Sequence, residues 1–275
     1  MRKIYLKLLI ASISSISLLL IIKLSKDSKL FMPSEYKQIK SSINNLSKYN
    51  DLGKRILKFT IVPSSYAKWS AKDFNICEKD CHYMSRLNPF KKNKEFKLNE
   101  FLRQDYLWGI PTAIASPTGT ISISQSTFHF YKNKIGFLEC DLAHEISHII
   151  NNHTYKVSAK GIQEVNKSKE EIKNITMKYR RELEIEADLH AMKMLFNSGI
   201  NPKACIDNLR FHAHVSGHVH KTEKESTHHG LEERINKLKK FEATDKINSK
   251  TTQVKRYQAI WKYDRDKNVL MYIPK

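Results

Sequence analysis

The sequence predicts an α+β fold that is mainly helical and carries a small β-sheet. Helices are indicated by apolar residues at helical spacing, over residues 142–152 and from about 169 to 197. Strands are indicated by β-rich or alternating segments at 55–63, 119–126 and 258–273. A length of 275 residues allows one sizeable core and does not require a second full domain.

The N-terminal half contributes short elements. Residues 34–48 form a polar helix whose apolar face consists of Ile39, Ile43 and Leu46. The strand at 55–63 ends at Pro63, because proline has no N–H to donate to a sheet. Residues 64–108 show no clear period, and Pro89 with the lysines around it suggests a loop.

The C-terminal half continues after the long helix. Gly199 ends that helix, and Asn201-Pro202 starts another with an N-cap and a proline at the first helical position. Residues 230–241 predict a further short helix, and residues 258–273 predict two strands around a polar turn.

Charge and the N-terminal segment bear on location and partners. The formal charge of +20 suits a partner such as nucleic acid or anionic lipid, but the lysines are scattered and no basic run is interleaved with aromatics.

Residues 1–30 begin with Arg2 and Lys3 and continue into an uncharged apolar run from Leu8 to Ile22, the layout of an export signal. No small-x-small cleavage site follows, which favours an uncleaved membrane anchor over a removed signal peptide.

The four cysteines are expected to form one or two disulfides after export, and two disulfides have three possible connectivities. They are Cys77, Cys81, Cys140 and Cys205. Cys77 and Cys81 are close enough in sequence to pair with one another. A metal site built on them with His82 lacks a second ligand pair at zinc-site spacing.

Residues 144–148 read His-Glu-Ile-Ser-His. On a helix, His144 and His148 lie one turn apart on one face, and Ile146 lies on the opposite face. Both imidazoles can then bind one zinc ion, with Glu145 beside the water that the metal carries. The alternative is a chance match, since the chain holds twelve histidines.

A tetrahedral zinc needs one more protein ligand before water. Glu184 and Asp188 lie one turn apart in the segment RRELEIEADLHA. Glu184 can complete the metal site, and Asp188 can reach a ligand imidazole N–H and fix its tautomer. Glu182 and Glu186 are rival ligands on periodicity alone, and a solvated acidic face is the alternative for the whole segment.

Three ordered motifs carry a resemblance to the HtpX/CAAX-prenyl-endopeptidase family of zinc metallopeptidases. They are His144-Glu145-x-x-His148, Glu184-x-x-Ala187-Asp188 and STHHGLEERINKL at 226–238. Residues 110–124 and 197–204 are similar to two further stretches of the family, so the resemblance covers about residues 110–240. Within the family, the chain is most similar to the bacterial envelope branch that includes LoiP and BepA.

The resemblance implies a zincin-like core of the gluzincin type with a small sheet. It makes His144, His148 and Glu184 the ligands of one zinc ion per chain and Glu145 the general base, as in a zinc metalloendopeptidase. It also places His228 near the metal and matches Arg234 to an arginine six residues later.

His228 and Arg234 are the candidates for stabilising the oxyanion or contacting substrate. His228 could instead occupy the open zinc position in a resting enzyme. Thr112 and His229 stand where the family usually has Asn and Pro, which affects the expected substrate contacts and leaves the metal ligands intact. The nearby His212, His214, His218 and His220 are read as a polar loop in preference to an accessory metal patch.

The predicted function is zinc-dependent hydrolysis of peptide bonds in envelope or membrane-associated proteins, in protein quality control. The predicted location is the bacterial cell envelope, either anchored in the inner membrane and facing the periplasm or periplasmic if the N-terminal segment is cleaved. The predicted partners are protein or peptide substrates and, through the apolar segment, the membrane. One alternative is a chaperone-like assembly factor on the same fold, and a more distant one is a basic binder of lipid or nucleic acid.

The predicted domain organisation has one peptidase core with flanking segments. Residues 1–30 are the signal peptide or anchor, 31–109 the N-terminal part of the peptidase domain, 110–241 the zinc metallopeptidase core, and 242–275 a tail with a β-hairpin.

Overall fold

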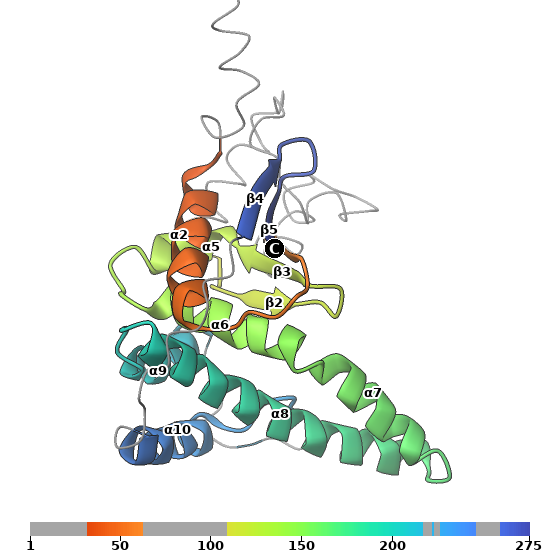
Figure 1. The fold of residues 1–275 in the computed structure, drawn as a ribbon. Helices are drawn as coiled ribbons and strands as arrows, with labels where there is room; N and C mark the ends of the chain where they lie inside the picture. Colours follow the sequence, from red (N-terminus) through yellow and green to blue (C-terminus); the bar gives the residue numbers. More distant parts are fainter. Residues whose placement is uncertain (1–31, 63–108, 217–221, 223–225, 246–258) are drawn as a thin grey trace, which may run out of the picture.

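The computed structural model combines one mixed β-sheet with a group of helices below it in Figure 1 and confirms the α+β fold class. It describes residues 32–62, 109–216, 222, 226–245 and 259–275. The predictions for residues 1–30 and for the pairing of Cys77 and Cys81 fall outside these ranges.

The sheet joins strands from both ends of the described chain. Its strands are β1 (Leu57–Val62), β2 (Ala113–Ala115), β3 (Thr120–Ser124), β4 (Ala259–Asp264) and β5 (Val269–Pro274), in the order β2-β3-β1-β5-β4. β1 pairs in parallel with β3, and the other neighbouring pairs are antiparallel. The C-terminal hairpin β4–β5 therefore extends the same sheet by pairing β5 with β1.

Alternation along the strands explains their burial. Ile121 and Ile123 of β3 are fully buried, as are Leu57 and Phe59 of β1. Successive side chains of a strand point to opposite faces, so these alternate residues share one face and pack into the core. Local alternation predicts such strands but not the parallel partner, because β1 and β3 are far apart in sequence.

The helices are α2 (Ser34–Tyr49), α5 (Gln125–Phe130), α6 (Phe137–Ile150), α7 (His153–Gln163), α8 (Lys169–Asn197), α9 (Lys203–Ser216) and α10 (Leu231–Asp245). Figure 1 shows α7 and the first half of α8 running side by side away from the body of the molecule. The predicted helices at 34–48, 169–197 and 230–241 are confirmed to within a few residues. α7 was not predicted, because His153 and Val157 are its sole buried positions and it has no apolar stripe.

Helix α6 lies at the centre of this arrangement. Leu142, Ala143 and Ile146 are fully buried on it, and the helix packs against α8, α9, α2 and the β2–β3 edge of the sheet. Burying such residues contributes roughly 1.5–3 kcal/mol for each large aliphatic side chain. The core thus fixes the helix that carries the sequence motif at 144–148.

The sheet and α2 are held together around a tyrosine. The hydroxyl of Tyr36 donates to the carbonyl of Asn268, at 2.5 Å, and accepts from the N–H of Ile61, at 3.2 Å. Its ring packs on Tyr263 of β4. These contacts attach α2 to β1 and to the C-terminal hairpin, which gives the five-stranded sheet one covered face.

A tight turn joins α6 to α7. Asn152 has a φ of 55°, in the left-handed region that asparagine tolerates better than most residues. Its side-chain oxygen accepts from Nη2 of Arg55 at 2.6 Å. This turn changes the chain direction and brings His153, the first residue of α7, back beside α6.

Within the described ranges, no helix has the combination of length and apolar character required to cross a membrane.

Candidate metal centre

Helix α6 presents two histidines from the face opposite its buried aliphatic residues. Nε2 of His144 and Nε2 of His148 lie 3.0 Å apart, and their side chains are 15% and 17% exposed. Ile146 is fully buried on the other side of the helix. The spacing of four residues therefore produces the arrangement expected of a shared ligand pair.

Helix α8 brings a carboxylate to the same point. Oε2 of Glu184 lies 3.3 Å from Nε2 of His144 and 3.6 Å from Nε2 of His148. The register of α8 is set at its start by a capping box, in which Ser168 and Glu171 satisfy each other's backbone N–H groups. Among the described residues, Glu184 is the glutamate whose carboxylate groups with the two histidines, and the flanking Glu182 is exposed.

The donor atoms fit a bound divalent cation. His144, His148 and Glu184 each offer one ligand atom, and these atoms lie within 4.8 Å of one another. Oε2 of Glu184 is buried and makes no hydrogen bond of good geometry, although histidine nitrogens surround it. Two imidazole nitrogens and one carboxylate oxygen, with an orphaned oxygen between them, are the donor set of a zinc site with an open position.

Asp188, one turn after Glu184, supports the first histidine. Its Oδ1 lies 3.0 Å from Nδ1 of His144. A proton on Nδ1 that is shared with this carboxylate leaves the Nε2 lone pair of His144 facing the site. Burial lowers the pKa of His144, but the carboxylates of Asp188 and Glu184 outweigh burial and raise it well above its usual value.

Arg234 of α10 holds Asp188 in turn. Nε and Nη2 of Arg234 each donate to one oxygen of Asp188, both at 2.8 Å. The Asp188 side chain is 6% exposed and that of Arg234 is 15% exposed, so the pair is largely removed from water. Burial alone would raise the pKa of Asp188, but Arg234 and His144 hold it well below its usual range.

Glu145 lies between the metal ligands and the sheet edge. One carboxylate oxygen accepts a hydrogen bond from the backbone N–H of Ala115 in β2, at 2.5 Å. Burial raises the pKa of Glu145 to about 7, against the opposing effects of His144 and the Ala115 N–H. A carboxyl group with a pKa near neutrality is suited to general acid–base work at physiological pH.

His228 approaches the same centre from the segment before α10. Its Nε2 lies 3.0 Å from Oε2 of Glu184, and its side chain is 47% exposed. Nη1 of Arg181 on α8 donates to the Ser226 carbonyl at 2.9 Å and so attaches this segment to the ligand helix. The structure thus brings the metal-site candidates together, whereas Arg234 reaches the centre through Asp188.

The comparison with protein families agrees with this geometry. The sequence model of peptidase family M48 matches residues 89–242. The chain belongs to peptidase family M48. Members of this family are zinc-dependent metallopeptidases, so the ligand geometry and the family point to the same chemistry. No curated protein and no solved structure matches the chain.

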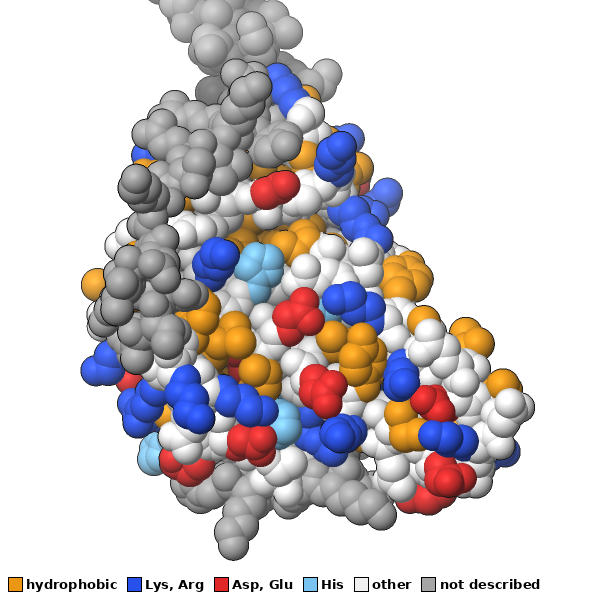
Figure 2. Space-filling model, turned by 60° about the horizontal axis from the view of Figure 1, so that its bottom comes forward, with side chains coloured by type: hydrophobic (Ala, Val, Ile, Leu, Met, Phe, Trp, Pro, Cys, Tyr) orange, Lys and Arg blue, Asp and Glu red, His pale blue; other side chains and the backbone are white. Residues whose placement is uncertain are grey.

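The M48 site opens into a pocket of about 370 Å³. Its walls come from β2, the start of α6, one face of α9 and residues 226–234. Figure 2 shows a face on which acidic and basic side chains alternate without one continuous basic area.

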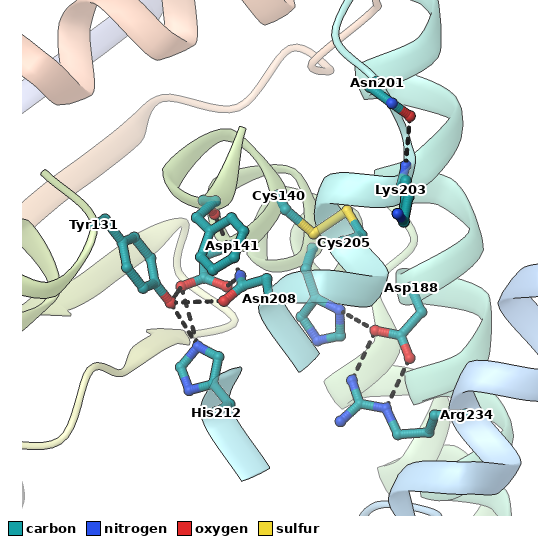
Figure 3. The surroundings of a disulfide bond; sticks show 12 residues. Tyr131, Cys140, Asp141, Asp188, Asn201, Lys203, Cys205, Asn208, His212 and Arg234 are labelled. Atoms are coloured by element: carbon teal, nitrogen blue, oxygen red, sulfur yellow. Dashed lines mark hydrogen bonds and ion pairs between the residues drawn. A yellow bond between two sulfur atoms is a disulfide. The ribbon is translucent and has the colours of Figure 1, made fainter. Parts of the chain in front are cut away.

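One wall of the pocket contains features that were not predicted from sequence. A disulfide joins Cys140 of α6 to Cys205 of α9, and both residues line the pocket (Figure 3). Four cysteines allow several pairings, so this connectivity required the packing of α6 against α9. In sequence, Cys205 falls on a predicted helix and Cys140 lies two residues before another, which does not determine the pairing.

A polar cluster lies beside that disulfide (Figure 3). The Tyr131 hydroxyl lies 2.7 Å from Oδ2 of Asp141 and 2.6 Å from Nε2 of His212, while Asn208 donates to Oδ1 of Asp141 at 2.6 Å. His212 and His214 lie on helix α9, which corrects the prediction of a polar loop for this part of the histidine cluster. His218 and His220 fall outside the described residues.

Proposed function

We propose that this M48 peptidase is a zinc-dependent endopeptidase of the gluzincin type that cleaves proteins of the bacterial envelope. The observation that carries the proposal is the convergence of His144, His148 and Glu184 beside the buried carboxyl group of Glu145. We assign one zinc ion per chain to the three ligand residues. The motifs shared with the LoiP and BepA branch support a role in protein quality control.

Zinc bound by these residues would supply a Lewis acid that polarises a peptide carbonyl and lowers the pKa of a water molecule. Glu145 takes the proton from the attacking water and passes it to the leaving amine. The N–H of Ala115 orients the Glu145 carboxylate by donating to one of its oxygens, and we assign the proton transfer to the second oxygen. A carboxyl pKa near neutrality serves both directions of this proton transfer.

His228 is the better placed of the two proposed oxyanion contacts. Its imidazole lies at the metal-ligand carboxylate and is half-exposed to the pocket. In a resting state the same imidazole would take the open zinc position. Arg234 lines the pocket, but two of its nitrogens are engaged with Asp188, so its main effect is to orient that residue.

The exposed edge of the sheet is suited to binding a peptide substrate. β2 is the edge strand of the described sheet, it lines the pocket, and Ile114 within it is 66% exposed. An extended peptide can add to an exposed strand edge through backbone hydrogen bonds, so that its scissile bond passes the metal ligands. This geometry suits an endopeptidase that accepts unfolded or extended segments.

The envelope location rests on two features. The apolar run within residues 1–30 has the layout of an export signal or anchor. The disulfide between Cys140 and Cys205 is of the kind that forms and persists in oxidising compartments outside the cytosol. We therefore place the peptidase on the extracytoplasmic side of the inner membrane, or in the periplasm if residues 1–30 are removed.

Zinc content of the full chain tests the proposal, by elemental analysis of the parent, His148→Ala and Glu184→Ala. We expect about one zinc per chain in the parent and its loss in both variants, because a tetrahedral site needs three protein ligands. Glu182→Ala is the matched control, since Glu182 lies two residues from the ligand and is exposed. Zinc that remains in both ligand variants would refute the ligand assignment.

Catalysis is tested by Glu145→Gln with casein as the substrate. This variant should retain zinc and lose nearly all turnover, because the amide cannot accept the proton from water. A loss of about 10²-fold or more is the expected size for removing a general base. Parent-like activity of Glu145→Gln would exclude Glu145 as the base.

A further inference from the structure

A further histidine lies behind the metal centre and takes no part in the proposed chemistry. His153, the first residue of α7, is 3% exposed. Its Nδ1 lies 2.9 Å from Nδ1 of His148, and its Nε2 lies 3.6 Å from Oε1 of Glu186. The rings of His148 and His153 meet edge to face, with their centroids 4.9 Å apart.

Nδ1 of His148 and Nδ1 of His153 can form a hydrogen bond only if one of the two carries a proton. A metal-binding His148 offers the Nε2 lone pair to the cation, so its own proton is on Nδ1. That N–H points at Nδ1 of His153, which must then be the acceptor. His153 consequently carries its proton on Nε2, the nitrogen that faces Glu186.

The two ligand histidines therefore have different supports. His144 donates its Nδ1 proton to Asp188, a carboxylate held by Arg234. His148 has no carboxylate at that atom within the described structure and meets a neutral imidazole instead. A partner of this kind fixes ring orientation and tautomer as a carboxylate does, but brings no full negative charge to the ligand.

We propose that His153 is a positioning residue for the metal ligand His148, whose Nδ1–H it accepts so that Nε2 stays directed at the zinc. This inference rests on the proposed zinc site. It also gives a different role to Glu186, a rival metal ligand on sequence periodicity. The Glu186 carboxylate faces the far nitrogen of His153 at 3.6 Å and Nζ of Lys156 at 3.7 Å, and so supports the positioning residue.

The local structure holds His153 in place for this purpose. The left-handed Asn152 turns the chain so that His153 comes back against α6, five residues after His148. Arg55 fixes that turn through the Asn152 side chain.

Two variants of His153 in the full chain separate positioning from packing. His153→Asn keeps an acceptor, because its side-chain oxygen occupies nearly the place of Nδ1. His153→Leu fills similar space but accepts no hydrogen bond. His190→Leu is the control, since His190 is a partly buried histidine that lies near Asn151, at the end of α6, and makes no contact with the ligands that the structure describes.

Zinc affinity, measured by competition with a chelator, is the main readout. We expect His153→Leu to weaken zinc binding by about 10–100-fold, the usual effect of removing a partner of a metal-ligating histidine. His153→Asn and His190→Leu should stay close to the parent. The visible spectrum of the cobalt(II)-loaded chain should change in His153→Leu and be retained in His153→Asn, a difference that loss of packing alone would not produce.

The outcomes distinguish this inference from the proposed function. Folded His153→Leu that binds zinc as tightly as the parent would refute the positioning role alone. If the leucine variant does not fold, the asparagine variant decides: parent-like affinity supports the role, and a tenfold loss in a folded protein contradicts it. A parent chain that binds no zinc would overturn both the metal site and the role of His153.

Discussion

The ion pair between Asp188 and Arg234 offers a test of the site's architecture that does not depend on activity. Arg234→Met removes the guanidinium but keeps an unbranched side chain of similar reach. Asp188, which is 6% exposed in the parent, would then keep His144 as its close partner among the residues that the structure describes. The perturbation therefore leaves a largely buried carboxylate without its stronger partner.

The expected cost follows from the two contacts that are lost. Each hydrogen bond from Arg234 to Asp188 is 2.8 Å long and charge-assisted. Charge-assisted bonds contribute about 1.5–3 kcal/mol each, and breaking a buried pair by removing one partner costs about 3–5 kcal/mol. We expect Arg234→Met to lower the free energy of unfolding by about 3–5 kcal/mol, and Arg234→Lys to recover part of this without the bidentate geometry.

Urea denaturation of the metal-free full chain measures this change. Arg210→Met is the matched control: Arg210 pairs with Asp207 at 3.2 Å on the surface of α9, and exposed pairs contribute about 0–1 kcal/mol. If Arg234→Met is no more destabilising than Arg210→Met, then the buried pair is not what holds α10 against α8, and the reasoning fails. Zinc affinity should also fall, because Asp188 would lose its fixed position behind His144.

Two other predictions use the disulfide and the general base. Replacing Cys140 and Cys205 by serine opens a loop of 65 residues and should cost about 4 kcal/mol of unfolding free energy; an unchanged urea midpoint would contradict this. Burial raises the pKa of Glu145 to about 7 and its ionised form is the base, so kcat/KM should fall as the pH falls below this pKa. Bound zinc moves the midpoint to lower pH, and a kcat/KM that rises between pH 7 and pH 5 would exclude Glu145 as the base.

The sequence carried enough local information to predict the ligand helices. His144 and His148 follow from helical spacing next to an apolar stripe, and α8 extends over the predicted range. The choice of Glu184 over Glu186 could not come from periodicity. It depends on which face of α8 is turned to the histidines of α6: Glu184 lies on that face, and Glu186, two residues later, lies against His153.

The residues that support the metal ligands from outside the motif could not be predicted locally, because long-range packing brings them to the site. His153 is five residues from His148, a spacing that an unbroken helix would place on another face, and it approaches because the chain turns at Asn152. Arg234 was predicted as an oxyanion or substrate contact, but its pairing with Asp188 depends on how α10 packs against α8. The parallel pairing of β1 with β3 and the Cys140–Cys205 bond likewise join segments that share no local pattern.

The pocket walls are fastened to one another by bonds of different chemistry. A covalent bond ties α6 to α9, an ion pair ties α8 to α10, and a single backbone hydrogen bond ties the edge strand to Glu145. A reductant acts on the first wall, and acid that protonates Asp188 acts on the second. Acid acts on the third at a higher pH than on the second, because burial raises the pKa of Glu145 to about 7 whereas the pKa of Asp188 lies well below its usual range. A reductant can therefore loosen the α6–α9 wall, and mild acid can weaken the contact of Glu145 with the edge strand, each without acting on the other.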